Sequence, residues 1–459
     1  MDTVKIPDSV DRLREHFNTG QTKPIPWRLS QLKALQKLLE DNGPQLAEAL
    51  AADLGKAEAE AYLTEIDFTR ADVKHIRKNL RSWTRPQRVH TPSHLLPGRS
   101  FTLLEPLGVT TIIGPFNYPV QLLLSPLAGA LAAGNTVIVK PSEHATATAE
   151  LLETLLLEYL DNDAIAVVQG GVPEVTELLA QRVDHIFFTG STRVGKIVAK
   201  AAAENLTKVT LELGGKSPAI VEPGIDLSAV ATRIAWGKFT NAGQTCIAPD
   251  YVLAVGDTAE TLKEELAVAI NAMYGTSPAD SPDYGRIIND ETFDRLTGYL
   301  DNGRAVVGGT HNREKRYIAP TVLDRVDLDS PVMQEEIFGP ILPIIPVNTL
   351  EEAIGFVRQG EKPLSLYPFC ASDSSKRKVL TRTSSGAVGF NIPLVHCDIP
   401  GLPFGGVGLS GQGAYHGKHS VENFSHRKPV FDKPLMPDTM RVIYAPWSEW
   451  KQKIMRKLR

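Results

Sequence analysis

The sequence predicts an α/β fold built on a doubly wound parallel sheet, and two observations support this prediction. Between residues 109 and 211, five short runs rich in β-branched residues alternate with stretches of helical periodicity. Short buried strands that alternate with helices form right-handed βαβ units, which assemble into a parallel sheet covered by helices on both faces. Strands and helices mix again over residues 260–420, so we expect a second α/β region there.

The segment before this alternation is predicted to be helical. Leucines recur at helical spacing over residues 29–39, so we expect helices between residues 9 and 83, with a break at residues 42–44. Three prolines then interrupt the periodicity between residues 86 and 97. We therefore expect residues 86–105 to form an arm rather than an element of the core.

The alternating region divides into individual elements. Predicted strands cover residues 109–113, 136–140, 165–168, 185–188 and 208–211. Predicted helices cover residues 146–160, 173–181 and 192–204. A further helix is predicted over residues 226–242 and leads into Cys246. After residue 420 the pattern weakens, and prolines punctuate a second arm segment.

Composition excludes several classes of function. The chain has 459 residues, of which 42% are hydrophobic and 22% charged, as is typical of a soluble globular enzyme. Its formal net charge of −4 gives no electrostatic basis for nucleic acid or an anionic membrane as the main partner. The N-terminus lacks the apolar segment of a signal peptide, and no apolar run reaches the ~18 residues that span a bilayer. We therefore expect a cytoplasmic protein.

The cysteines point to chemistry rather than to structure. Cys246, Cys370 and Cys397 are too few and too scattered for a disulfide framework, and no metal-site spacing occurs, so we expect no metal. Cys246 ends the motif NAGQTC, and Glu212 lies upstream in LELGGK, beside a Gly-Gly turn. A thiol attacks a carbonyl as its thiolate, and a carboxylate can later deliver water to the resulting thioester. Cys370 and Cys397 are expected to be structural, or at most to line a pocket.

Two glycine-rich segments are candidates for a dinucleotide loop. Residues 189–195, TGSTRVG, follow a predicted strand and open a predicted helix, where backbone amides bind anions; a plain helix cap is the alternative. Residues 406–411, GVGLSG, match the G-x-G-x-x-G pattern but follow no predicted strand, so we expect a flexible loop. Lys140 and Glu143, after another strand, can hydrogen-bond ribose hydroxyls.

Six motifs occur in an order that resembles the aldehyde dehydrogenase superfamily, and the resemblance covers nearly the whole chain. They lie at residues 114–119, 140–143, 189–195, 211–216, 241–246 and 335–340. The chain is similar to the class 3 branch, which includes the aromatic and fatty aldehyde dehydrogenases, in residues 244–251, 331–336, 402–408 and 415–418. The resemblance implies a Rossmann-like cofactor domain, an α/β catalytic domain, a small β arm for oligomerisation, and a homodimer.

The resemblance also implies domain boundaries. They are an NAD(P)-binding domain over 1–85 and 106–211, a catalytic domain over 212–420, and an arm over 86–105 and 421–446. Residues 447–459 form a basic amphipathic tail in which Trp447, Trp450, Ile454 and Leu458 share one helical face. Such a tail can lie on an anionic membrane surface, but more often packs on the protein or frays, so we expect at most weak membrane contact.

Three residues receive catalytic roles from the resemblance. Cys246 is implied to be the nucleophile that carries a thiohemiacetal and then a thioester, and Glu212 the base that directs water to that thioester. Asn117 is implied to donate its side-chain amide to the oxyanion, together with the backbone N–H of Cys246. The alternatives are an inert buried cysteine, a structural carboxylate and a turn asparagine. The implied reaction is the NAD(P)-dependent oxidation of an aldehyde to a carboxylic acid.

Further residues are assigned to cofactor and substrate in the same way. The implied cofactor-binding residues are Lys140, Glu143, Gly190, Ser191, Gly195, Gly214, Glu336 and Phe338. A 2′-phosphate would meet a like charge on Glu143 but an opposite charge on Lys140, so we expect NAD or NADP with a modest preference for NAD. Tyr118 and Trp236 are implied to line a tunnel for aromatic or medium to long aliphatic aldehydes, and plain core aromatics are the alternative.

Other functions stay open at the level of sequence. A coenzyme A-acylating or reductive relative would use the same thioester, but Glu212 favours hydrolysis. A non-enzymatic structural role is disfavoured by the intact set of Cys246, Glu212 and Asn117. The chain departs from the family pattern at Phe116, where the family usually has Trp, and at residues 391–393, where Asn-Ile-Pro replaces Asn-Asp. The second departure leaves the identity of the substrate open rather than the reaction.

Overall fold

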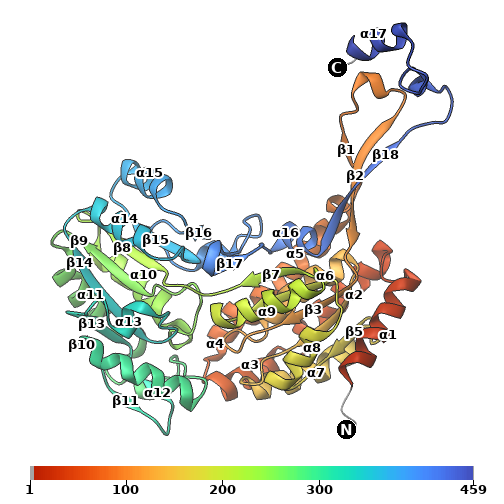
Figure 1. The fold of residues 1–459 in the computed structure, drawn as a ribbon. Coiled ribbons are helices and arrows are strands. Elements are labelled where there is room, and N and C mark those ends of the chain that lie inside the picture. Colours follow the sequence, from red (N-terminus) through yellow and green to blue (C-terminus); the bar gives the residue numbers. More distant parts are fainter. Residues whose placement is uncertain (1–4, 458–459) are drawn as a thin grey trace.

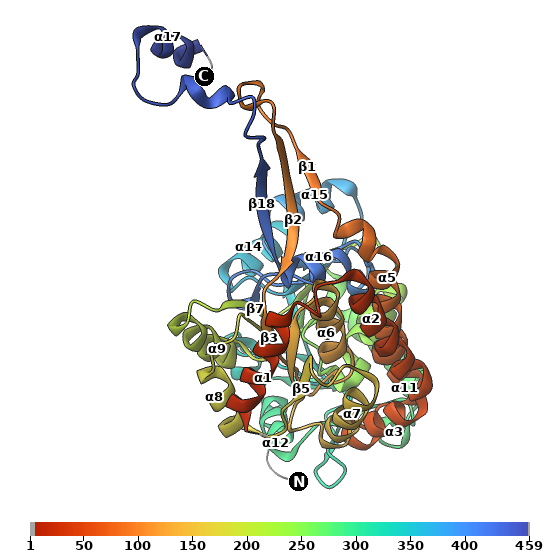
Figure 2. The same cartoon turned by 90° about the vertical axis from the view of Figure 1, so that its right-hand side faces the viewer.

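The computed structural model describes residues 5–457 and shows two α/β bodies from which a narrow arm projects (Figure 1). The predicted fold class is confirmed, because each body contains a largely parallel sheet with helices packed against it. In the view turned by 90°, the arm extends away from both bodies and carries the last helix at its tip (Figure 2). No helix in residues 5–457 combines the length and hydropathy that a membrane span needs.

The N-terminal segment is helical, as predicted. Its elements are α1 (Ile6–Thr19), α2 (Ile25–Asp41), α3 (Gly43–Leu54), α4 (Glu58–Ala61), a short π-helix η1 (Tyr62–Ile66) and α5 (Asp67–Trp83). The break between α2 and α3 falls at the predicted place. The Asn42 side chain donates to the backbone oxygen of Leu38 at 3.0 Å, and Pro44 occupies the first turn of α3. Of the periodic leucines of α2, Leu29 is half-buried and Leu32, Leu35, Leu38 and Leu39 are buried. The helix α2 packs against α5 and α6.

The first sheet has six strands in the order β17-β7-β6-β3-β4-β5. They are β3 (Val109–Ile113), β4 (Thr136–Lys140), β5 (Ile165–Val167), β6 (His185–Thr189), β7 (Lys208–Glu212) and β17 (Gly411–Gln412). Its helices are α6 (Gln121–Ala133), α7 (Thr146–Tyr159), α8 (Val172–Ala180) and α9 (Thr192–Glu204). The five predicted strands pair in parallel, and the direction of the connections reverses between β3 and β6. Open α/β sheets bind ligands at the carboxyl ends of strands beside such a reversal.

The second sheet has seven strands in the order β10-β13-β14-β9-β8-β15-β16. They are β8 (Pro218–Val221), β9 (Tyr251–Val255), β10 (Arg304–Val307), β13 (Thr321–Asp324), β14 (Ile341–Val347), β15 (Ser365–Phe369) and β16 (Ala387–Val388). A small hairpin joins β11 (His311–Asn312) and β12 (Tyr317–Ile318). The helices are α10 (Leu227–Phe239), α11 (Thr258–Tyr274), α12 (Asp290–Tyr299), α13 (Pro331–Gln334), α14 (Leu350–Gln359) and α15 (Asp373–Arg382). A continuous apolar core lies beneath this sheet.

The arm is a three-stranded antiparallel sheet. It contains β1 (Gln87–Val89), β2 (Arg99–Pro106) and β18 (Ser425–Asp432). The helix α16 (Gly417–Asn423) spans the predicted boundary at residue 420 and packs on α6, so it belongs to the first body. The strand β17 also returns to the first sheet, from within the segment predicted as catalytic domain. The tail forms α17 (Glu449–Lys457), while Leu458 and Arg459 lie outside the described residues.

Candidate active site

A strained turn places Cys246 at the end of α10. The helix ends at Phe239 rather than at residue 242 as predicted, and a tight 3₁₀ turn, η3 (Thr240–Gly243), follows it. Asn241 and Ala242 have φ angles of 54° and 51°, in the left-handed region that non-glycine residues rarely adopt. Helical periodicity cannot reveal such a reversal, because it depends on contacts made to the turn from elsewhere. We call residues 241–246 the nucleophile turn.

A cleft of about 1010 Å³ lies beside this turn and along the carboxyl ends of the first sheet. It brings together most of the residues that the sequence singled out. Those in its lining are Asn117, Lys140, Glu143, Gly190, Ser191, Glu212, Gly214, Cys246, Glu336 and Phe338. The cleft also contains Arg193 at the start of α9, a cation that sequence analysis did not select although it stands within the motif TGSTRVG.

Glu212 ends β7 and is buried in the wall of the cleft. Neither of its carboxyl oxygens has a hydrogen-bond partner among the described residues. Burial therefore raises the pKa of Glu212 well above its usual range, since no neighbouring donor or cation offsets the loss of water. A carboxyl group with this environment is a poor structural cap and a strong proton acceptor once it is ionised.

Cys246 is half-buried and faces the same cleft. Burial raises the pKa of the Cys246 thiol, and the carboxyl groups of Glu336 and Glu212 raise it further. The thiol form therefore predominates at neutral pH. A proton acceptor or a nearby positive charge is needed before the sulfur can act as a nucleophile.

Asn117 lies between β3 and α6, and its side chain is buried. The amide nitrogen donates to the backbone oxygen of Gln244 at 2.9 Å, which fixes the side chain against the nucleophile turn. A primary amide has two N–H groups. One N–H donates to Gln244, and the second has no hydrogen-bond partner among the described residues.

The dinucleotide half of the cleft is formed by the start of α9 and the end of β4. Ser191 caps α9 by accepting from the backbone N–H of Val194 at 3.4 Å, and the residues of the first turn, Thr192 to Val194, line the cleft. Lys140 is buried and donates to the Glu143 carboxylate at 2.7 Å. Partial burial by itself would raise the pKa of Glu143. The hydrogen bond from Lys140 and the charge of Lys140 outweigh this effect and lower the pKa. These groups fit a pyrophosphate and a ribose, respectively.

The opposite wall holds Glu336 and Phe338. Burial raises the pKa of Glu336 to about 8, and the charge of Asp250 adds to this effect. A Cβ atom on Gly214 would lie 1.8 Å from a carboxyl oxygen of Glu336, so only glycine leaves room for this carboxyl group. Phe338 has a φ of 49°, and its ring packs edge-on against Phe116 with the ring centres 5.8 Å apart.

Three predicted site residues lie outside the lining of the cleft. Gly195 packs on β7, where a Cβ atom would lie 2.6 Å from the Leu213 side chain, so its role is close packing of α9 on the sheet. Tyr118 is buried, and its hydroxyl group hydrogen-bonds to Thr245 at 2.6 Å. Trp236 is half-buried and packs against the same apolar cluster as Cys246.

The segment 406–411 forms a loop that ends in β17, as expected from its lack of a preceding strand. It does not open a helix of the kind that binds a dinucleotide. Its backbone instead supports the site. Leu213 donates to the backbone oxygen of Ser410 at 3.1 Å, and the hydroxyl group of Thr192 donates to that of Leu409 at 3.1 Å.

Comparison with known proteins agrees with this geometry. A model of the aldehyde dehydrogenase family matches residues 2–430. The chain belongs to the aldehyde dehydrogenase family. It is 49% identical over 446 residues to an aldehyde dehydrogenase of Rattus norvegicus that is described as dimeric and NADP-preferring. This match covers 97% of this chain and 98% of the relative. It is 48% identical over 419 residues to the 4,4'-diaponeurosporen-aldehyde dehydrogenase of Staphylococcus aureus, and that match covers 91% of each chain.

Solved structures of relatives have the same fold over nearly the whole chain. The structure of the substrate-bound state of Staphylococcus aureus AldH is 44% identical in sequence and superposes with a TM-score of 0.96. The match covers 100% of each chain. An aldehyde dehydrogenase of *Mycobacterium tuberculosis* complexed with NAD+ is 29% identical, with a TM-score of 0.85, and covers 94% of this chain and 91% of its own. With its class 3 relatives, the protein is an NAD(P)-dependent dehydrogenase that oxidises aldehydes.

Proposed function

We propose that this dehydrogenase oxidises aldehydes to carboxylic acids through a covalent adduct on Cys246. Glu212 is the proposed general base, and Asn117 the proposed oxyanion donor. The observation that carries the proposal is the single cleft whose wall contains all three side chains. They come from separate parts of the chain, so their convergence is a property of the fold rather than of one local motif.

The first half of the reaction forms the adduct. The Cys246 thiol loses its proton to solvent, and the resulting thiolate adds to the aldehyde carbon. The carbonyl oxygen becomes an alkoxide beside the free N–H of Asn117 and the backbone N–H of Cys246, which stabilise the developing charge. When bound, NAD(P) supplies the acceptor for the hydride that leaves this adduct. A thioester on Cys246 remains.

The second half of the reaction releases the acid. Glu212 takes a proton from a water molecule as the water oxygen attacks the thioester carbon. The C–S bond then breaks, the Cys246 thiolate regains a proton from Glu212, and the carboxylic acid is released. A buried carboxyl group without structural partners supports this role. It also favours hydrolysis over transfer of the acyl group to coenzyme A. A single turnover with aldehyde and NAD(P), with and without coenzyme A, separates the two outcomes by the product formed.

The proposed substrates are aromatic or medium- to long-chain aliphatic aldehydes. Trp236 packs on the apolar cluster that also borders Cys246 and Cys397. An apolar environment next to the nucleophile favours substrates with large apolar groups. The Staphylococcus aureus relative acts, by its name, on 4,4'-diaponeurosporen-aldehyde. A panel of aldehydes assayed with both cofactors would define the range.

The proposed cofactors are NAD and NADP. Glu143 favours NAD because it would repel a 2′-phosphate, whereas Arg193 and Lys140 in the same cleft would attract one. Relatives described as NADP-preferring count against the modest preference for NAD that the sequence predicts. We therefore propose that the enzyme uses both NAD and NADP.

We also infer a homodimer, in keeping with relatives described as dimeric. The arm leaves its apolar side chains uncovered at the tip, where Leu435 is 91% exposed and Trp447 is 62% exposed. Because these relatives are described as dimeric, we propose that a second copy of the chain covers the tip of the arm. Weak contact of α17 with an anionic membrane remains a prediction, and sedimentation with anionic and neutral lipid vesicles would test it.

The test of the proposed function is the Cys246→Ala variant. We expect it to lose dehydrogenase turnover and to bind NAD(P) nearly as well as the wild type, because Lys140, Glu143 and the start of α9 are unchanged. Cofactor binding is measured by calorimetry, and turnover by the formation of reduced cofactor. Substantial turnover by Cys246→Ala would overturn the assignment of the nucleophile.

A further inference from the structure

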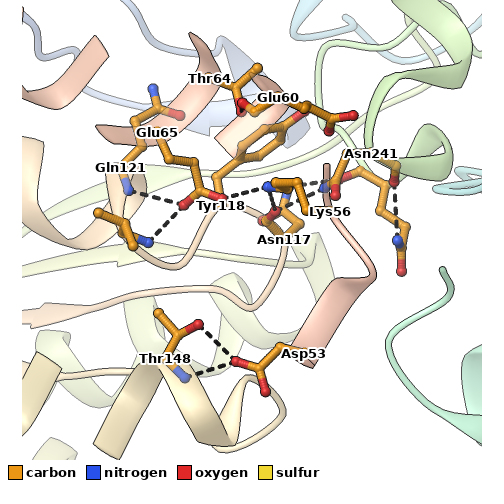
Figure 3. A network of polar contacts seen from close by, with 12 residues as sticks. Asp53, Lys56, Glu60, Thr64, Glu65, Asn117, Tyr118, Gln121, Thr148 and Asn241 are labelled. Carbon is orange, nitrogen blue, oxygen red and sulfur yellow. Dashed lines mark hydrogen bonds and ion pairs between the residues drawn. The ribbon is translucent and has the colours of Figure 1, made fainter. Parts of the chain in front are cut away.

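We propose that Lys56 and Glu65, a buried ion pair behind the cleft, are positioning residues that hold Asn117 against the nucleophile turn. The proposal rests on the role given above to Asn117. Neither residue belongs to the lining of the cleft, and both side chains are completely excluded from solvent. Figure 3 shows the pair between the N-terminal helices and the segment that carries Asn117 and Tyr118.

Lys56 lies between α3 and α4, and its ammonium group contacts three parts of the network. It forms an ion pair with Glu65 and donates to the backbone oxygen of Asn117 at 3.2 Å. It also lies over the ring of Tyr118, 4.3 Å from the ring centre. A buried ammonium group without such partners would be very unfavourable, so these contacts fix its position and, with it, the carbonyl group of Asn117.

Glu65 holds the other end of the same segment. One carboxyl oxygen accepts from Lys56, and the second accepts from the backbone N–H groups of Val120 at 2.8 Å and Gln121 at 3.3 Å. These amides belong to the start of α6, where a carboxylate is favoured by the unpaired N–H groups and the helix dipole. The ion pair therefore anchors the chain at Asn117 itself and at Val120 and Gln121, just after it.

The anchored segment is joined directly to the nucleophile turn. Asn241 donates through its side-chain amide to the backbone oxygen of Asn117 at 2.8 Å, so this one carbonyl group receives both Lys56 and Asn241. In return, the side chain of Asn117 holds the backbone oxygen of Gln244. The hydroxyl groups of Tyr118 and Thr245 complete the junction. A shift of the Asn117 peptide would therefore move both the oxyanion donor and the turn that presents Cys246.

The hydrogen-bond partners of Lys56 and Glu65 distinguish this ion pair from one that only stabilises the fold. Buried ion pairs are commonly replaced by apolar residues of similar volume at little cost to stability. Here, apart from the ion pair itself, the hydrogen bonds of both side chains go to the backbone of residues 117–121. A misplacement of about 1 Å at a reacting group can lower the rate by about 10²-fold. We therefore expect loss of the pair to affect the rate more than the binding of cofactor.

The first experiment compares Lys56→Met with the double variant Lys56→Met/Glu65→Met, using the full chain with NAD(P) bound. Lys56→Met should lower kcat by about 10- to 10²-fold, lower the unfolding temperature, and leave the Kd for NAD(P) within about threefold. The double variant removes the unpaired carboxylate and should recover the unfolding temperature while kcat stays low. Recovery of kcat together with stability would overturn the positioning role.

A control variant separates positioning from general destabilisation. Leu38→Ala removes a buried side chain of α2 and should lower the unfolding temperature while leaving kcat near that of the wild type. If kcat instead falls in Leu38→Ala as far as in Lys56→Met, the effect is one of stability and the proposal fails. Should Lys56→Met fail to fold, Glu65→Gln serves as the second variant, because it keeps an oxygen acceptor for α6 but loses the ion pair.

The second experiment is a double-mutant cycle with Asn117→Ala. If Lys56 positions the Asn117 side chain, the loss of kcat caused by Lys56→Met should be several-fold smaller in the Asn117→Ala background than in the wild type, and the remaining loss comes from the nucleophile turn that the same carbonyl group holds. Independent effects that multiply would overturn the positioning role and leave the role of Asn117 intact. Wild-type turnover by Asn117→Ala alone would instead overturn the oxyanion role, and the positioning proposal with it. The two failures therefore give different results.

Discussion

At the scale of single residues, the surroundings of Glu212 and Cys246 decide their chemistry. Both are ionisable groups in one cleft, and burial raises the pKa of each. The carboxyl oxygens of Glu212 have no hydrogen-bond partner within residues 5–457, so no contact there ties this group to a structural role. This arrangement suits a reaction in which a thiol must lose a proton and a water molecule must later lose one as well.

We predict that Glu212→Gln slows deacylation more than hydride transfer. A rapid burst of reduced cofactor should precede a steady state lowered by about 10²- to 10⁴-fold, because an amide cannot accept the proton of water. In the wild type, Glu212 is protonated and inactive at low pH, since its pKa is raised, so turnover should increase as the pH rises through that pKa. Stopped-flow assays over a pH series measure both effects. A steady state near that of the wild type would mean that Glu212 is structural.

A second prediction at this scale concerns Glu143. Replacing Glu143 with Gln removes the negative charge beside the ribose but keeps a hydrogen-bond acceptor, so the ratio of kcat/KM for NADP to that for NAD should rise several-fold. The charge is present in the wild type because Lys140 holds Glu143 ionised. Glu150→Gln, at an exposed carboxylate outside the cleft, is the control. An unchanged ratio in Glu143→Gln would show that this side chain does not face the ribose.

At the scale of elements, the nucleophile turn depends on a second segment of the chain. Gly243 has a φ of 74°, and a Cβ atom there would lie 2.2 Å from the backbone oxygen of Gly339. Backbone, unlike a flexible side chain, cannot move aside without shifting the loop that carries Glu336 and Phe338. The turn and this loop therefore form one packed unit on the two sides of the cleft.

We predict that Gly243→Ala lowers kcat by at least about 10-fold and also lowers the unfolding temperature. The methyl group would push Gly339 away, and the residue would be strained at its positive φ. Gly224→Ala is a suitable control, because Gly224 also has a positive φ, 81°, but a Cβ atom there would have no heavy atom within 4 Å. If both variants lose turnover equally, backbone strain rather than the contact with Gly339 is responsible.

At the scale of the whole molecule, the arm is the part that a single chain leaves incomplete. Its three strands project from the bodies (Figure 2). The residues after β18, at the tip, include exposed apolar side chains such as Leu435 and Trp447. Exposed apolar clusters of this kind mark interaction surfaces. A dimer in which the tip packs on the second copy would cover them.

We predict that removal of residues 433–459 shifts the protein from dimer to monomer while both bodies stay folded, because β18 and its pairing with β2 are retained. Sedimentation velocity gives the mass, and thermal unfolding reports on the bodies. Leu435→Asp should weaken the dimer in the same direction. Leu206→Asp, at an equally exposed leucine on the first body, should not. A truncated protein that remains dimeric would place the dimer contact outside the tip.

The class of fold was predictable from the sequence because strand and helix periodicity is a local property. It predicted the five parallel strands, the break before Pro44 and the arm. The oxidation of aldehydes, and Cys246 and Glu212 as candidate catalytic residues, were predictable because their motifs are contiguous in the chain and resemble those of a known family. The loop at 406–411 could be set aside because no strand precedes it.

Only the tertiary structure decided what depends on contacts between distant segments. The end of α10 at Phe239 and the left-handed turn after it are held by hydrogen bonds from Asn117 and its neighbours, which no local pattern records. Lys56 and Glu65 belong to no motif. Their hydrogen bonds to the backbone of residues 117–121 form only once the N-terminal helices pack on α6. Candidate catalytic residues can be recognised from short contiguous motifs, whereas their position relative to one another depends on packing between distant segments.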